Sequence, residues 1–199
     1  RGKPATHIKY GEASAVLAGS SLLTLAFEII TDKKYSLNSK LKNKIVSSLA
    51  GCAGHTGIAG GQELDLKYEN KNKKLNQIIN MQKKKTGKLF NFCLYAVGEV
   101  ANKSSKEKIF LSNLGEEIGL LFQLADDFLD IKGSKKLVGK LVKKDIKKGK
   151  STLLNLMGDK KAYKYAYKLK KKILRKLKKH GKKAQDLINT IEFILGRNF

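Results

Sequence analysis

We predict an all-α helical bundle for this chain of 199 residues, and three features of the sequence support that prediction. Only one proline, Pro4, occurs, so helices can continue almost everywhere. Apolar residues recur with the 3.6-residue period of a helix face, and no segment of convincing length alternates as a strand would. Because 41% of the residues are hydrophobic, the chain can bury a substantial core, and we expect one domain over residues 1–199.

The apolar pattern predicts helices along most of the chain. The first runs from Tyr10 to Ile30, and a polar stretch, 31–44, separates it from a segment rich in small residues, 45–61. Small residues let helices or a ligand approach a backbone closely. A lysine-rich loop near 68–74 follows. The later helices are expected at Leu75–Met81, Leu89–Val97, Ser105–Leu129, Lys160–Lys178 and Lys183–Leu195.

Membrane spans and disulfides are not expected. The apolar runs at 13–18 and 22–30 end well before the roughly 18 consecutive apolar residues that a span requires. Cys52 and Cys93 lie in small or apolar surroundings without neighbouring Cys or His. This predicts two buried, reduced core cysteines in a cytoplasmic protein.

The net charge of +25 could indicate nucleic acid or an anionic membrane as a partner. Of the 42 basic residues, however, only Arg1, Arg175 and Arg197 are arginine, which is the residue that base reading and bidentate phosphate recognition favour. We therefore expect no nucleic acid. A basic helical nucleic-acid-binding module, motivated by the run 168–179, is kept as the weaker alternative.

The segment 122–130, Phe-Gln-Leu-Ala-Asp-Asp-Phe-Leu-Asp, carries the strongest chemical signal. Asp126 and Asp130 are four residues apart, so a helix places their carboxylates on one face, with Asp127 adjacent. Three acids close to one another are costly to desolvate without a counter-ion. Magnesium prefers a few carboxylates together with phosphate oxygens and water. The pattern fits a magnesium–diphosphate site, and a solvated acidic helix end is the alternative.

Basic residues that could face a diphosphate occur on both sides of this segment. Downstream, Gly139-Lys140 and Gly149-Lys150 lie in a lysine-rich loop. Upstream, Lys85-Thr86-Gly87 offers an ammonium, a hydroxyl and a permissive glycine at an expected helix break. Taken singly, each is more typical of an ordinary surface or loop residue.

In order and spacing, these elements resemble the trans-isoprenyl diphosphate synthases, the farnesyl and geranylgeranyl diphosphate synthase family. The resemblance covers most of the chain. The matching segments are residues 1–7, 11–13, 61–66, 85–90, 122–130, and 139–140 through 149–152.

The resemblance implies a helical bundle of the isoprenoid synthase type, in which two Asp-rich motifs hold three Mg²⁺ ions on an allylic diphosphate. Asp126, Asp127 and Asp130 resemble the second motif. They are therefore the expected metal ligands, and with Lys85 the expected catalytic residues.

The resemblance also implies the substrate contacts. Arg1 resembles the second arginine of a pair, the one that contacts isopentenyl diphosphate. For Gln62 and Asp65 two roles stay open, lining the cavity near the substrate or satisfying a helix end, because buried polar groups are usually paired in either case. The expected allylic diphosphate contacts are Lys85, Thr86, Gln123, Lys140 and Lys150.

The implied activity is Mg²⁺-dependent condensation of isopentenyl diphosphate with dimethylallyl, geranyl or farnesyl diphosphate, by ionisation, condensation and elimination, in a homodimer. A C15 or a C20 product is expected, and the sequence does not distinguish the two, because the chain-length determinant of the family lies largely near the first Asp-rich motif. That motif does not occur in this sequence, so we expect the N-terminal helices of the bundle to be missing from the chain. A non-catalytic subunit of a prenyl synthase is the main alternative.

Overall fold

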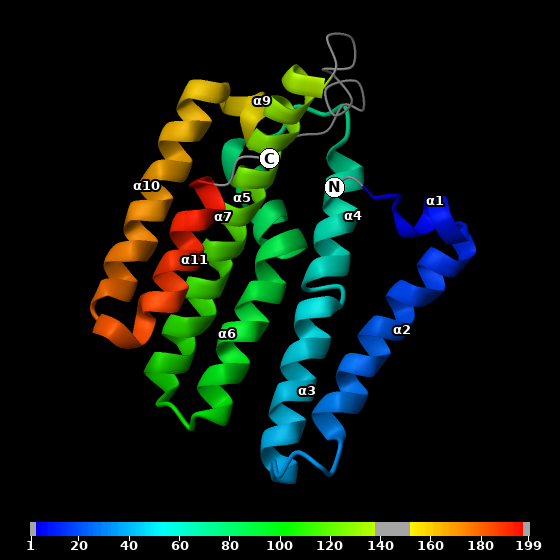
Figure 1. Ribbon diagram of the computed structural model, residues 1–199, viewed down its shortest axis with the longest axis vertical. Coiled ribbons are helices and arrows are strands. Elements are labelled where there is room, and N and C mark those ends of the chain that lie inside the picture. The colour runs from blue at the N-terminus through cyan, green and yellow to red at the C-terminus, as the bar shows by residue number, and fades with distance from the viewer. Residues whose placement is uncertain (1–2, 138–151, 197–199) are drawn as a thin grey trace. The chain divides into compact units, whose positions relative to one another are not determined.

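The computed structural model describes residues 3–137 and 152–196, and side chains for 3–130 and 152–196 (Figure 1). Every regular element in this part of the chain is helical, which confirms the all-α prediction. The helices are α1 Thr6–Tyr10, α2 Glu12–Thr31, α3 Ser39–Ala53, α4 Ile58–Tyr68, α5 Leu75–Gln82, η1 Lys83–Gly87, α6 Lys88–Val100, α7 Ser105–Leu137, α9 Leu153–Met157, α10 Asp159–Lys178, η2 Gly181–Ala184 and α11 Gln185–Gly196.

The chain forms two compact units, Arg1–Ser47 and Ser48–Phe199. The prediction of a single domain therefore stays a prediction. In the first unit, Gly11 adopts a φ of 86° at the junction of α1 and α2, a backbone conformation that glycine accepts without steric cost. Lys42 then donates hydrogen bonds to the carbonyl oxygens of Thr31 and Asp32, which ties α3 to the end of α2.

Helix α2 contains no buried residue. Among the described residues it is the helix that is long and apolar enough to cross a membrane, by length and composition alone. A mostly buried core helix of a soluble protein and a signal sequence near an N-terminus pass the same test. The expectation that the chain has no membrane span therefore stays a prediction.

The second unit is built around α7. Leu114, Ile118, Leu121 and Leu124 recur at helical spacing along one face of α7, and each is at most 3% exposed. Helices α6, α10 and α11 pack against α7, and α10 packs against α11 (Figure 1). This burial fixes the rotation of α7 about its axis, and with it the direction in which its polar residues point.

Glycines allow α6 and η1 to approach the backbone of α7 closely. A Cβ atom on Gly115 would lie 2.4 Å from the carbonyl oxygen of Phe90, and one on Gly119 would lie 2.6 Å from the Cα of Gly87. Neither distance can be accommodated without moving backbone. The segment 85–90 is thereby held directly against the segment 115–123.

An ion-pair cluster joins α7 to α10. Glu117 accepts from Lys172 at 2.8 Å and from Lys176 at 2.7 Å, and its side chain is 14% exposed. Burial alone would raise the pKa of Glu117, but the hydrogen bonds and charges of the two lysines hold that pKa below its ordinary value. The pair of lysines therefore stabilises the contact between the two helices when Glu117 is ionised.

Several sequence-based boundaries need correction. Helix α3 begins at Ser39, inside the polar stretch 31–44, and α7 continues to Leu137, beyond the expected end at Leu129. Cys52 is buried as predicted, and burial raises the pKa of its thiol. The prediction for Cys93 was wrong, because Cys93 is exposed.

Candidate functional site

The turn that carries Lys85 and Thr86 is a single π-helical turn, η1, and the predicted helix break at this position was wrong. The backbone passes from α5 through η1 into α6 without interruption. Isolated π turns inside α-helices are rare and are frequent at functional sites. Successive side chains of a helix point roughly 100° apart, so Lys85 and Thr86 can reach two different helices.

Gly61 of α4 makes room for this turn. A Cβ atom at position 61 would lie 2.2 Å from the backbone nitrogen of Lys85 and 2.6 Å from its Cα. Because the backbone of α4 touches the backbone of η1, the position of Lys85 is set by main-chain packing rather than by a flexible side-chain contact.

Lys85 points toward α4 and forms an ion pair there. Its Nζ donates to Oδ2 of Asp65 at 2.5 Å, and Asp65 is 7% exposed. The Lys85 side chain is 30% exposed, so its ammonium lies at the edge of the solvent-accessible surface. A buried carboxylate that holds an ammonium in this way restricts the position of the ammonium. Gln62, whose role the sequence analysis left open together with that of Asp65, is exposed.

Thr86 points instead toward α7. Its hydroxyl donates to Oε1 of Gln123 at 2.8 Å, and Nε2 of Gln123 donates to Oδ1 of Asp127 at 2.9 Å. Three predicted site residues, which lie 37 and 4 positions apart in sequence, thus form one continuous hydrogen-bonded chain. The amide orientation of Gln123 is fixed by this chain, because its oxygen accepts and its nitrogen donates.

The acidic residues Asp126, Asp127 and Asp130 follow on α7, where the first two are half-buried and the third is exposed. No group of three or more His, Cys, Asp or Glu side chains in the described part of the chain is arranged to hold a metal by itself. The carboxylates of Asp126, Asp127 and Asp130 fit Mg²⁺, because this ion is usually held by one or two carboxylates together with phosphate oxygens and water.

A second polar cluster lies two helical turns from Gln123 toward the start of α7, and the sequence interpretation missed it. Lys88 donates to Glu116 at 2.6 Å, and Nδ2 of Asn91 donates to Ser112 at 2.7 Å and to Glu116 at 3.1 Å. Asn91 also accepts a weak bond from the thiol of Cys52 at 3.8 Å. The sequence feature that could have predicted this cluster is Asn91, a polar residue that helical spacing places on the side of α6 that faces α7.

The remaining predicted site residues, Arg1, Lys140 and Lys150, lie outside the described residues. The structure therefore brings together Lys85, Thr86, Gln123 and Asp127 through direct contacts or adjacent positions.

The sequence model of the family described as polyprenyl synthetase matches residues 1–191. The chain is 38% identical over 164 residues to a farnesyl diphosphate synthase from Bacillus subtilis (strain 168), covering 80% of this chain and 55% of that protein. It is 34% identical over 203 residues to a farnesyl diphosphate synthase from Escherichia coli (strain K12), covering 100% of this chain and 68% of that protein.

A crystal structure of an FPP/GFPP synthase from Zymomonas mobilis superposes with a TM-score of 0.82 at 33% identity, covering 98% of this chain and 65% of that one. The chain spans about half the length of the first curated relatives that it matches. On the match over residues 1–191, the chain belongs to the polyprenyl synthetase family.

Proposed function

We propose that this chain carries the allylic diphosphate half of a prenyltransferase that condenses isopentenyl diphosphate with an allylic diphosphate. The observation that supports the proposal most strongly is the hydrogen-bonded chain from Thr86 through Gln123 to Asp127, next to the ammonium of Lys85. It combines the cation, hydroxyl and carboxylate that a metal-bound diphosphate requires, on backbone fixed by glycine packing.

In the proposed reaction the bond between the allylic carbon and the diphosphate oxygen breaks, and the diphosphate leaves with the electron pair. The double bond of isopentenyl diphosphate then attacks the allylic cation, and loss of a proton restores an allylic product that is five carbons longer. Lys85 would stabilise the negative charge on the departing diphosphate, and Thr86 would do so by turning its hydroxyl from Oε1 of Gln123 to a phosphate oxygen. Because Asp65 fixes Lys85, little reorganisation is needed when that charge develops.

Asp126, Asp127 and Asp130 would hold Mg²⁺, with three ions expected in the complete site. The metal would supply charge neutralisation and orientation of the diphosphate. Gln123 would position Asp127 through the hydrogen bond from Nε2, since that bond leaves the second carboxylate oxygen in a defined direction. Lys140 and Lys150 are proposed as further diphosphate contacts, and Arg1 as a contact to isopentenyl diphosphate.

The proposal includes a C15 or C20 product, because the similar proteins carry the names farnesyl and geranylgeranyl diphosphate synthase. A homodimer in the cytoplasm is proposed on family membership alone.

The test is Mg²⁺-dependent condensation by the full-length gene product, with isopentenyl diphosphate and dimethylallyl, geranyl or farnesyl diphosphate as substrates and mass spectrometry of the products. Asp126→Ala should reduce the rate by at least about 100-fold, as expected for loss of a group that stabilises developing charge. Asp186→Ala, which removes an exposed carboxylate from the first turn of α11, is the matched control and should retain activity.

No turnover by the folded wild-type protein with any of the three allylic substrates would contradict the proposal. That result would favour the non-catalytic subunit.

A further inference from the structure

Helix α10 is sharply two-sided. Ala162, Ala166, Leu169, Ile173 and Leu177 recur at spacings of three and four and are all buried against the bundle. The opposite side, which we name the basic face, carries exposed cations over a helix of 20 residues, or about 30 Å. The basic face consists of Lys160, Lys161, Lys164, Lys168, Lys171, Lys172, Arg175 and Lys178.

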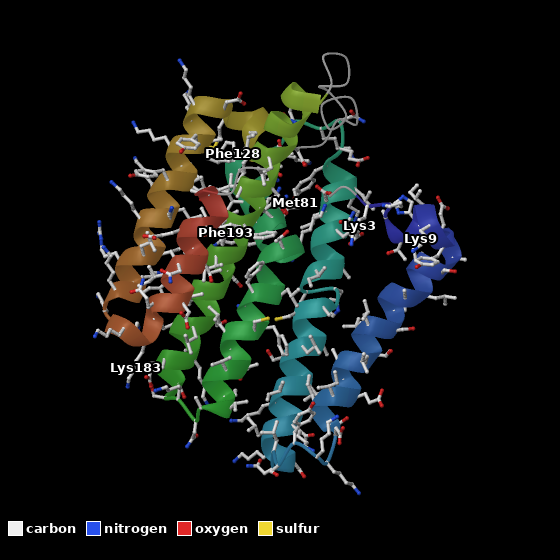
Figure 2. The ribbon with its side chains drawn as sticks, in the orientation of Figure 1. Lys3, Lys9, Met81, Phe128, Lys183 and Phe193 are labelled. Atoms are coloured by element: carbon white, nitrogen blue, oxygen red, sulfur yellow. The ribbon has the colours of Figure 1, made fainter. Side chains whose placement is uncertain are left out.

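The charge of the basic face is hardly compensated by the protein. The only acidic residue in α10 is Asp159, at its first position. Lys172 pairs with Glu117 of α7 at 2.8 Å, and the structure records no carboxylate partner for the other basic-face residues within 3–130 and 152–196. Figure 2 shows the nitrogen-tipped side chains of α10 pointing away from the bundle along its outer edge. Like charges at helical spacing repel one another, and a dense negative surface would relieve that repulsion.

Two tyrosines border the basic face one turn apart. Tyr163 is 56% exposed and packs edge-on against Phe128 of α7, with ring centroids 5.7 Å apart. Tyr167 is 47% exposed, and Nζ of Lys171 lies 4.8 Å from its ring centroid. Tyrosine rings favour the headgroup level of a bilayer, where one end is apolar and the other is wet. Long lysine side chains beside them can reach lipid phosphates while their stems cover the ring.

We propose that the basic face of α10 docks on an anionic phospholipid bilayer. A row of cations bordered by exposed tyrosines is the pattern of a helix that lies on a membrane surface. Nucleic acid fits less well, because Arg175 is the only arginine on the face and lysine does not form the bidentate contacts that read bases. The docking does not depend on the proposed reaction, since no residue of the basic face belongs to the site described above.

The first test is sedimentation with vesicles of phosphatidylcholine alone and with vesicles in which one third of the lipid is phosphatidylglycerol. The wild-type protein should bind only the anionic vesicles, and less at high salt. The variant K164E/K168E/K171E should bind them at least roughly 100-fold more weakly, from the contribution of each cation near an anionic surface. The matched control is K33E/K40E/K106E, which reverses three exposed lysines that are not part of α10 and changes the net charge equally.

Equal losses in the two triple variants, or equal binding of the wild type to both vesicles, would overturn the proposal. Condensation with soluble substrates should be unchanged in both variants, so a failure of docking is separable from a failure of the proposed reaction.

A second measurement tests insertion at the headgroup level. The chain contains no tryptophan, so Tyr167→Trp introduces a single reporter at the border of the basic face. Its emission should shift to the blue when anionic vesicles are added and should stay unshifted with duplex RNA. A shift with RNA and none with vesicles would replace the lipid by nucleic acid as the partner, and would overturn the proposal.

Discussion

Gly61→Ala is the sharpest perturbation of the site, because it adds one methyl group where two backbones touch. That methyl group would lie 2.2 Å from the backbone nitrogen of Lys85 and 2.7 Å from the carbonyl carbon of Lys84. Both atoms belong to the main chain of η1, so the conflict cannot be relieved by turning a side chain. Either α4 or η1 must move.

The expected cost follows from two opposing effects. Overpacking of this kind destabilises by about 1–3 kcal/mol, and replacing a helical glycine by alanine returns about 0.5–1 kcal/mol. The difference spans roughly 0–2.5 kcal/mol. Because the added methyl group meets backbone atoms, a net loss of about 1–2 kcal/mol in the free energy of unfolding is expected. The catalytic effect should be larger, because a shift of about 1 Å in a charged group at a reacting centre can reduce the rate by roughly 100-fold.

The assay combines urea unfolding with kcat/KM for the proposed condensation in the full-length protein. Gly51→Ala is the matched control, because Gly51 also lies in a helix, α3, and a Cβ atom there meets nothing within 4 Å. The control should be as stable as the wild type or slightly more stable, with unchanged kcat/KM. If Gly61→Ala had the same stability and kcat/KM as the wild type, the contact with η1 would not be what holds Lys85 in place.

Three further predictions concern side-chain contacts of α4 and α7. Lys85→Met should lower the free energy of unfolding by about 1–3 kcal/mol, because it leaves the buried Asp65 carboxylate without its cation. Adding Asp65→Asn should recover part of that loss in a urea-unfolding cycle, and additive losses would contradict the coupling. Gln123→Leu should reduce the condensation rate by roughly 10- to 100-fold and raise the Mg²⁺ concentration needed for half-maximal activity. The reason is that the substitution removes the hydrogen bond that positions Asp127. An unchanged Mg²⁺ titration would argue against this positioning role of Gln123. Because the pKa of Glu117 is lowered in the folded state, its stabilising contribution should be present above about pH 4.5 and disappear as the pH falls through the lower folded-state pKa. The difference in unfolding free energy between wild type and Glu117→Gln should therefore be seen at pH 7 and shrink as the pH falls below the ordinary glutamate pKa of 4.5. A difference independent of pH would be inconsistent with ionisation of Glu117.

Helical period explains why much of α7 could be predicted from the sequence. Gln123 and Asp127 are four residues apart, so any helix at this position places them on one face, and the structure shows the hydrogen bond between them. The same period predicts the buried leucines of α7 and the buried face of α10. Such relations are local, because they depend only on spacing within one helix.

Contacts between helices could not be predicted in this way. The exposure of Cys93 is an example, because its apolar surroundings in sequence give no information on which face of α6 is covered. Leu89 and Val97, four residues away on each side, are also exposed. Local composition predicts burial only on average, and helix rotation decides it for each residue.

The sequence by itself determined the helical class, the position of most helices and the acidic residues at 126–130, because each of these depends on residue type and on spacing within a few turns. Only the tertiary structure decided that Asp65 holds Lys85 and that Thr86 reaches Gln123. Both contacts are made by residues of one π-helical turn that packs against two helices at glycine positions. That fit depends on backbone atoms from segments far apart in the chain, and no local pattern encodes their distance.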